Sequence, residues 1–196
     1  MTDRELLTAY VMHGDEKSLG TFMGRYQDSM FRFVSRLLGD PNAAQDVVQQ
    51  AFVQVIRHPK RLLSVDCCHN WLLRVARNLG VDHLRRTARQ RRVTETLQTL
   101  TPAATDKEPA HEAAVEQREL LDLVYCEIER LSPRHRELLL LRVQEKKTYR
   151  EIAEITGLSA TNVGFLLHQA MKTMTQRLRG VGEARPRPEE RSPNDE

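Results

Sequence analysis

The segment from Thr148 to Met174, TYREIAEITGLSATNVGFLLHQAMKTM, constrains the fold more than any other part of the chain. It predicts two short helices joined by a tight turn. Thr148 and Glu151 have the spacing of a capping box at the start of the first helix. Gly157 suits the left-handed residue that ends a helix, and Ser159 is placed to cap the second helix.

Apolar residues recur at helical spacing in the second of these helices, which predicts one buried face and one free face. They are Val163, Leu166, Leu167, Ala170 and Met174. A helix, a glycine turn and a half-exposed helix form the layout of a helix-turn-helix, which places its second helix in the DNA major groove. An ordinary helical hairpin in an all-α protein fits the same pattern, so this segment alone leaves both readings open.

The composition of the 196-residue chain allows one large domain or two small ones. The sequence contains neither a transmembrane run nor the apolar core of a signal peptide, so we expect a cytoplasmic protein. The net charge of +3 is mild, so any argument for nucleic-acid binding depends on where the charge lies.

The sequence offers little support for metal or enzyme chemistry. Cys67, Cys68 and His69 are adjacent, but no second group of ligands with zinc-site spacing accompanies them. An odd total of three cysteines does not indicate a disulfide framework. We find no nucleophile–base pair or phosphate-binding loop. We therefore expect no metal site, no cofactor and no enzymatic activity.

The first half of the chain reads as consecutive helices. We expect one helix over 3–13, a long one ending at Gly39, and a third that starts at Asp40–Pro41 and runs to Pro59. In the third helix, we expect an inward face of Val47, Val48, Ala51, Phe52, Val55 and Ile56, and an outward face of Asp46, Gln49, Gln50 and Gln54. A loop over 59–69 should follow.

A fourth helix, expected over 70–92, concentrates positive charge. Its arginines are Arg74, Arg77, Arg85, Arg86, Arg89, Arg91 and Arg92, against the single acid Asp82. Its first half also keeps an apolar face, so it should be docked on one side and basic on the other, as phosphate binding requires. Trp71 is more readily interpreted as a core anchor than as a platform for an unpaired base.

We divide the chain into a domain over 1–92, a linker over 93–112, a second domain over 113–179 and a disordered tail over 180–196. The linker and the tail lack apolar periodicity and contain prolines. In the second domain, Ser132–Pro133 predicts a helix start, and 138–143 predicts a buried run.

Two motifs in this order resemble a known family. DPNAAQDVVQQAFVQVIRH followed by NWLLRVARNLGVDHLRR resembles region two of bacterial sigma-70-type factors. LSPRHRELLLLRVQEKKTYREIAEITGLSATNVGFLLHQAMKTMTQRL resembles their region four. The chain has no room for regions one or three, so it is most similar to the small extracytoplasmic-function type. The resemblance implies an all-α fold of two helical domains joined by a flexible linker.

In the family, a helix of region two binds a clamp coiled coil of core RNA polymerase. The resemblance places this contact on Asp46, Val47, Gln49, Gln50 and Phe52. The family often has glutamate where this chain has Gln50, so one charge-assisted contact is missing. The next segment of the family captures the minus-ten promoter element. Its matching positions are Trp71, Arg74, Arg77, Asn78, Asp82, Arg85 and Arg86, of which Asn78 and Asp82 could instead tie helices together.

Region four of the family reads the minus-thirty-five element with its second helix. The matching positions, with flanking cations, are Lys147, Arg150, Ser159, Ala160, Thr161, Asn162, Gly164, Phe165, His168, Gln169 and Lys172. Family members commonly carry cations where this chain has Gly164–Phe165 and Leu167–His168. This helix therefore has no arginine to pair with guanine.

The resemblance implies a sigma factor that binds core RNA polymerase, recognises promoter DNA and helps to melt it. An anti-sigma protein would be a further partner. The alternative is a helix-turn-helix regulator that does not bind polymerase, and a helical interaction protein without DNA binding is a third. The D-V-V-Q helix beside an arginine-rich helix favours the sigma factor, because a plain regulator needs no such pair.

Overall fold

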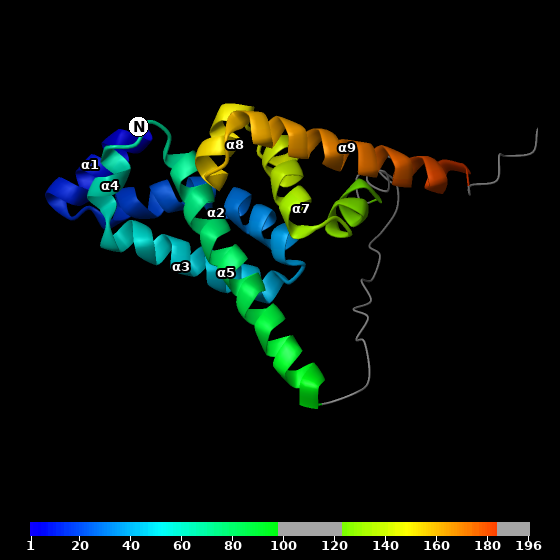
Figure 1. Ribbon diagram of the computed structural model, residues 1–196. Helices are drawn as coiled ribbons and strands as arrows, with labels where there is room; N and C mark the ends of the chain where they lie inside the picture. Colours follow the sequence, from blue (N-terminus) through cyan, green and yellow to red (C-terminus); the bar gives the residue numbers. More distant parts are fainter. Residues whose placement is uncertain (98–122, 184–196) are drawn as a thin grey trace, which may run out of the picture.

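The computed structural model describes residues 1–97 and 123–183, and this part of the chain is helical without strands (Figure 1). The N-terminal domain comprises α1 (Asp3–His13), α2 (Glu16–Leu38), α3 (Pro41–Arg57), α4 (Pro59–Leu63) and α5 (Cys68–Leu97). The C-terminal domain comprises a helical stretch over 123–129, α7 (Pro133–Leu139), the π-helical turn η1 (Leu140–Gln144), α8 (Tyr149–Thr156) and α9 (Ala160–Glu183).

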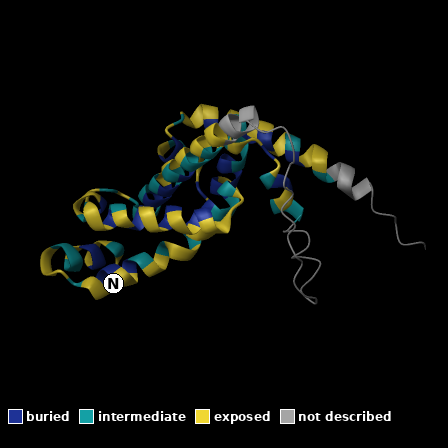
Figure 2. Cartoon of the chain, turned by 90° about the horizontal axis from the view of Figure 1, so that it is seen from below, coloured by how far each residue is buried: buried dark blue, intermediate teal, exposed yellow. Residues whose placement is uncertain are grey.

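Local signals set the helix ends in the N-terminal domain. Gly39 ends α2 with a φ of 71°, a left-handed conformation that glycine adopts without steric cost. Asp40 then caps α3 by accepting hydrogen bonds from two backbone N–H groups, and Pro41 occupies the first turn. The long α2 packs along α3, and both contact α5. Their buried faces form the core, including the fully buried Phe22 and Phe33 (Figure 2).

The C-terminal domain contains the expected helix-turn-helix. Thr148 and Glu151 form a reciprocal capping box at the start of α8, and these bonds lower the pKa of the Glu151 carboxyl. Gly157 ends α8 with a φ of 74°. Ser159 then accepts a hydrogen bond from the backbone N–H of Asn162 at the start of α9. Both helices bury their apolar sides, including Ile152 of α8.

Several details differ from the expectations. The segment 59–63, expected to be part of a loop, is the short helix α4, held by the buried Leu62 and by a hydrogen bond from Arg4 to the Leu63 carbonyl. Helix α5 runs to Leu97 rather than ending at 92. Ile56 and Val143, both expected to be buried, are 46% and 48% exposed, and the buried run ends at Leu141. Helix α9 runs to Glu183, four residues into the expected tail. The rest of the expected linker, 98–112, and the end of the tail, 184–196, lie outside the described residues.

The two domains pack against each other in this structure. Helix α8 lies on α5, and η1 and α7 contact α2 (Figure 1). The buried apolar side chains of both domains form one continuous cluster. The distal half of α5 extends away from the other helices. None of the helices in the described ranges, 1–97 and 123–183, is long and apolar enough to span a membrane.

Candidate functional site

A groove of about 620 Å³ lies between α2 and α3, and we call it the α2–α3 groove. Its lining combines apolar side chains with amides and one carboxylate. The lining residues are Met23, Gln27, Asp28, Phe31, Gln45, Val48, Gln49, Phe52, Val53 and Ile56. Three of these apolar side chains are substantially accessible: Phe31 at 37%, Val53 at 40% and Ile56 at 46%. Accessible apolar side chains gathered in a groove are typical of a binding surface.

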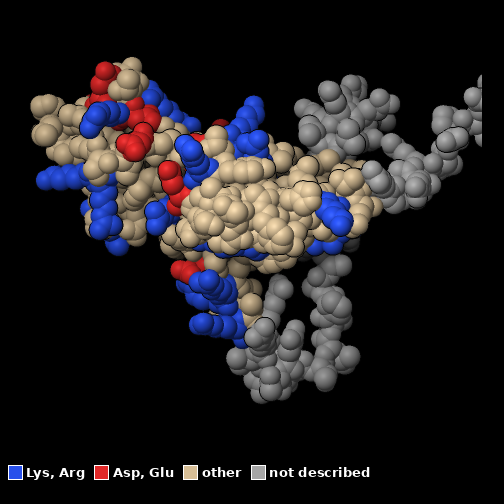
Figure 3. Space-filling view, turned by 45° about the horizontal axis from the view of Figure 1, so that its top comes forward, with Lys and Arg blue, Asp and Glu red and all other residues tan. Residues whose placement is uncertain are grey.

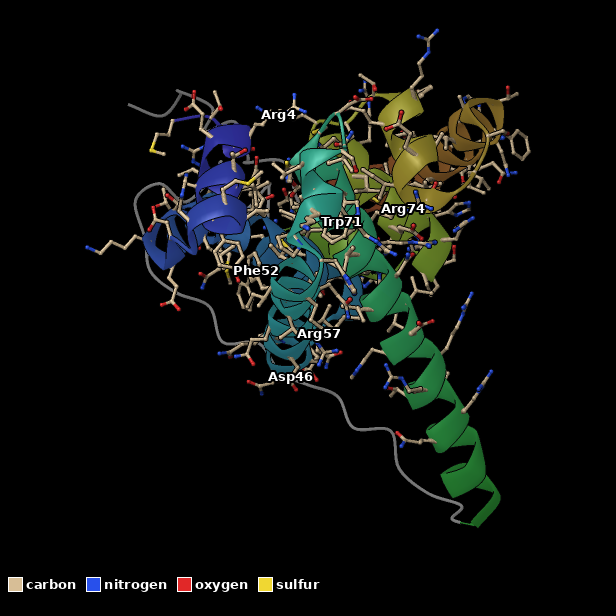
Figure 4. All side chains as sticks on the ribbon, turned by 90° about the vertical axis from the view of Figure 1, so that its left-hand side faces the viewer. Arg4, Asp46, Phe52, Arg57, Trp71 and Arg74 are labelled. Carbon is tan, nitrogen blue, oxygen red and sulfur yellow. The ribbon has the colours of Figure 1, made fainter. Side chains whose placement is uncertain are left out.

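The residues expected to bind polymerase fall into two groups around this groove. Asp46, Gln49 and Gln50 are exposed on α3, while Val47 and Phe52 are buried in the core at 4% and 6% exposure. Figure 4 shows Asp46 near the N-terminal end of α3, with Phe52 further along the helix. Phe52 still contributes to the groove wall, whereas Val47 does not line it.

Sequence reasoning missed the apolar part of the groove. Phe31 and Val53 were not singled out, and Ile56 was assigned to the core. Helical spacing alone does not separate an apolar residue that packs inside from one at the edge of the packed face. Met23, Phe31, Val53 and Ile56 together would have indicated an apolar face wider than one neighbouring helix covers.

The expected DNA-binding residues of α5 lie in two different structural environments. Trp71 is half-buried and packs against the core, while Arg74 and Asn78 are exposed (Figure 4). Arg85, Arg86 and Arg89 are exposed on the part of the helix that extends from the body, and basic side chains gather along it in Figure 3. The side chains of Arg91 and Arg92 lie outside the described part of the structure.

Two polar residues of this helix make local contacts. Asn78 accepts a hydrogen bond from Arg77, and Asp82 lies 3.5 Å from Arg85 in an exposed ion pair. The backbone carbonyl of Asp82 also accepts a hydrogen bond from Arg86. All of these contacts lie within α5. In them, Asn78 and Asp82 bind neighbouring arginines of their own helix and do not bridge two helices.

Arg77 differs from the other arginines because it faces the C-terminal domain. Its Nε lies 2.6 Å from Oε1 of Glu137 on α7, and its second terminal nitrogen lies 3.3 Å from Oε2. The two side chains are only 13% and 3% exposed. Shielding from water strengthens the attraction within this two-point ion pair, and removing either partner would leave the other charge buried and unpaired.

A second group of polar contacts joins α5 and α2 to the segment after η1. His69 Nε2 lies 3.3 Å from Glu145, which also accepts a hydrogen bond from Ser29 on α2. His69 Nδ1 lies 3.2 Å from the amine of Lys147. Burial raises the pKa of the Glu145 carboxyl, but hydrogen bonds from His69, Ser29 and Gln144 outweigh it and hold the pKa below its ordinary value.

Further pairs complete what we call the domain interface. Arg36 on α2 donates to Gln144 at 2.6 Å and stacks over the Tyr125 ring. Asn70 on α5 donates to Glu151 on α8. The residues of the domain interface are Ser29, Arg36, His69, Asn70 and Arg77 on the N-terminal side, and Tyr125, Arg136, Glu137, Gln144, Glu145, Lys147 and Glu151 on the C-terminal side.

The recognition face of α9 is exposed as the helix-turn-helix pattern predicts. Ser159, Thr161, Asn162, Phe165, His168, Gln169 and Lys172 are all exposed, and so is Arg150 on α8. Phe165 is 60% exposed. Lys147 differs from the expectation of a phosphate contact, because it is 7% exposed and lies between His69 and Glu151. A long-range contact with α5 therefore decides its position.

Cys67, Cys68 and His69 do not gather further ligands around them. Burial raises the pKa of the Cys68 thiol to about 11, which opposes the thiolate form that binds metals. His69 is engaged by Ser29 and Glu145. Within residues 1–97 and 123–183, no group of three or more His, Cys, Asp or Glu side chains is arranged to hold a metal ion.

Two family models match the chain in the order of its two domains. The model for Sigma-70 region 2 matches residues 22–90, and the model for Sigma-70, region 4 matches residues 121–174. The first match contains the α2–α3 groove and the basic helix α5. The second contains the helix-turn-helix and most of the C-terminal side of the domain interface.

Curated relatives align with the chain along most of their length. The chain is 23% identical to the ECF RNA polymerase sigma factor SigW of Bacillus subtilis, over 87% of this chain and 94% of SigW. It is 29% identical to SigL of Mycobacterium tuberculosis, over 80% and 86% of the two chains.

Two solved structures share the fold. The sigma factor RpoE of Bartonella quintana, in complex with the anti-sigma factor NepR, aligns with a TM-score of 0.65 at 16% identity, covering 81% of this chain and 97% of RpoE. CnrH, in complex with the cytosolic domain of CnrY, aligns with a TM-score of 0.64 at 20% identity, covering 91% and 97%.

Proposed function

We infer how this protein works from one premise: it belongs to the sigma-70 family, within the extracytoplasmic-function group, and it directs transcription initiation. Matches to regions two and four on one chain support this premise. The alternative, a helix-turn-helix regulator that does not bind polymerase, is not favoured, because it leaves the region-two match without a purpose. The roles of individual residues are our proposals.

We propose that core RNA polymerase binds at the α2–α3 groove. Asp46, Gln49 and Gln50 present a polar row on α3, and Phe31 and Ile56 add accessible apolar area beside it. An apolar centre with a polar rim is the usual anatomy of a protein–protein interface. The single observation that carries this proposal is the accessible apolar lining of the groove.

The helix α5 is the proposed contact to the melted minus-ten region. Arg74, Arg85, Arg86 and Arg89 project cations from one rigid helix, which suits the backbone of a displaced strand. Trp71 and Asn78 lie at the packed end of the same helix. The half-buried Trp71 fits a structural anchor that also borders the strand.

The exposed face of α9 is the proposed minus-thirty-five contact. Thr161, Asn162, His168 and Gln169 can donate and accept hydrogen bonds at base edges, and Arg150 and Lys172 can contact phosphates. No enzymatic step is needed, because binding energy drives strand opening. We place the protein in the cytoplasm, where polymerase and promoter are. An anti-sigma protein is a further proposed partner, by analogy with RpoE in its complex with NepR.

Reconstitution with core polymerase tests this function. The purified chain should co-elute with bacterial core polymerase and direct transcription from promoter fragments. An Asp46→Ala/Gln49→Ala variant should lose co-elution, because it removes two side chains of the exposed polar row on α3, of which Gln49 also lines the groove. Gln54→Ala on the same helix is the matched control. A chain that binds duplex DNA but ignores core polymerase from its own species would contradict the sigma-factor assignment.

A further inference from the structure

Phe165 is a large apolar side chain on the face of α9 that lies opposite the core. It is 60% exposed, whereas Val163 is fully buried and Leu167 is only 3% exposed. The geometry of an α-helix places both of these buried residues about 200° around the axis from Phe165. Packing within the domain therefore does not account for an aromatic ring at this position.

Phe165 also stands at the centre of the proposed minus-thirty-five contact. Residues three and four positions apart share one face of a helix, so Phe165 is surrounded there by Thr161, Asn162, His168 and Gln169. All four neighbours are polar and exposed. Of these five side chains, only Phe165 has no hydrogen-bonding group. It can contribute to binding only where the DNA offers an apolar group.

The first turns of α9 are held in a fixed position. Ser159 accepts a hydrogen bond from the backbone N–H of Asn162 and so caps the helix. A Cβ built at Gly164 would lie 3.5 Å from the Tyr149 ring, which shows that this ring packs closely against α9 beside Phe165. A fixed backbone places the Phe165 side chain at a defined point on a bound duplex, as selective recognition requires.

The major groove of DNA offers one apolar group to such a ring. Base edges in this groove present hydrogen-bond donors and acceptors, and thymine adds its C5-methyl group, which phenylalanine can contact. A helix-turn-helix places its second helix in this groove. Asn162 and Gln169 belong to the residue types that pair with adenine, and the segment 159–172 has no arginine to pair with guanine. This face of α9 therefore suits A·T base pairs.

We propose that Phe165 is a specificity-determining residue: it contacts the methyl group of a thymine in the minus-thirty-five element and selects for that base. This inference deepens the function proposed above and rests on it, because it names one base that α9 would read. DNA is favoured over a protein partner for the ring, since every neighbour one turn away on this face is polar.

Replacing thymine by uracil tests the contact, because uracil lacks the methyl group but keeps the donors and acceptors of the base. The full chain, alone and with core polymerase, first selects its preferred duplex from a randomised pool. Each thymine of that duplex is then replaced in turn by deoxyuridine. One replacement should weaken wild-type binding about fourfold, which corresponds to about 0.8 kcal/mol, as expected for one buried methyl-sized group.

Variants of α9 assign the effect to one side chain. Phe165→Ala should bind the thymine and deoxyuridine forms equally, while Phe165→Leu, which stays apolar, should keep part of the preference. Met171→Ala is the matched control, because Met171 is an apolar side chain of α9 at 52% exposure that lines a separate groove with Tyr149. This control should discriminate as the wild type does. Circular dichroism verifies that each variant is folded.

Three results would overturn the proposal. In the first, the wild type enriches no duplex or is indifferent to every replacement. In the second, Phe165→Ala keeps the preference for thymine. In the third, Phe165→Ala binds the selected duplex normally but core polymerase less tightly, which would make the ring a protein contact.

Failure of the proposed function gives a different result. The chain would then not bind core polymerase, while the comparison of thymine with deoxyuridine can still be made with the chain alone. A chain that binds polymerase and promoter but does not sense the methyl group would reject only the role of Phe165. The two failures are therefore distinguishable.

Discussion

The α2–α3 groove and the packed end of α5 lie in one domain but present opposite kinds of surface. The groove leaves Phe31, Val53 and Ile56 in contact with water, while Arg77 on α5 is withdrawn from water and paired. Accessible apolar area is unfavourable until a partner covers it, so the groove favours any encounter that buries it. A paired arginine has already satisfied its charge. The difference separates a surface that a partner can cover as it stands from one whose charge is already satisfied within the chain.

The largest expected effect comes from placing a charge in the groove. Ile56→Asp should weaken core polymerase binding by about 30-fold or more, equivalent to about 2 kcal/mol, because an interface centre would then bury an unpaired carboxylate. Polymerase affinity, measured by titration, checks this. Met12→Asp, at a 68% exposed position on α1, is the control. Equal polymerase affinity of the two variants would mean that the α2–α3 groove is not the polymerase-binding surface.

A second experiment disturbs the packing that supports both surfaces. A Cβ at Gly80 of α5 would lie 3.3 Å from the Leu37 side chain of α2. Gly80→Leu should therefore cost about 1–3 kcal/mol of unfolding free energy. Gly24→Ala on α2, where nothing lies within 4 Å, should instead gain roughly 0.5–1 kcal/mol. Urea denaturation measures both, and a stable Gly80→Leu chain would contradict close packing of α5 on α2.

Acid should weaken the domain interface through protonation of Glu145. Since the pKa of this carboxyl is lowered in the folded chain, its stabilisation is complete above the ordinary value of 4.5 and is lost as the pH falls through the folded value. Relative to Glu145→Gln, the wild type should lose about 1 kcal/mol more stability below that ordinary value. Its neighbours His69, Lys147, Ser29 and Arg36 are identical in both proteins. Denaturation at several pH values measures the difference, and parallel curves would contradict it.

The smallest effect compares two arginines one helical turn apart. Arg74→Ala should lower the salt dependence of single-strand binding by the free chain, with a slope reduced by about 0.7, because one phosphate contact is lost. Arg77→Ala should leave this slope unchanged, since Arg77 is paired with Glu137 and withdrawn from solvent. Titrations at several salt concentrations compare the two. Equal changes in slope would mean that Arg77 contacts DNA despite its pairing with Glu137.

Helix positions could be predicted because their signals are local. The pair Thr148–Glu151, the glycines at 39 and 157, and Asp40–Pro41 each act on neighbouring backbone, and each has the predicted role in the structure. The short helix α4 was missed because its stability comes from a distant contact, the hydrogen bond from Arg4 to Leu63. A five-residue helix carries too little periodicity to be recognised.

For the candidate site, the sequence predicts which residues are exposed and on which helix they lie, but not which residues they contact. The spacing on α9 gave its exposed face, and the arginine run gave the basic part of α5. No sequence pattern pairs Arg77 with Glu137 or places Lys147 against His69, because those contacts depend on how the domains dock. Ile56 follows the helical spacing of the core, but α2 does not cover it.

The low positive charge of the α9 recognition face predicts that the two proposed DNA contacts differ in their sensitivity to salt. Thr161, Asn162, Phe165 and Gln169 displace few counterions when they meet DNA, whereas Arg74, Arg85, Arg86 and Arg89 displace several. A rise in ionic strength during osmotic stress should therefore weaken the proposed melted-strand contact more than the proposed contact to the upstream duplex, where only Arg150 and Lys172 meet phosphates. Under such stress, we expect the protein to keep finding its promoters while opening fewer of them.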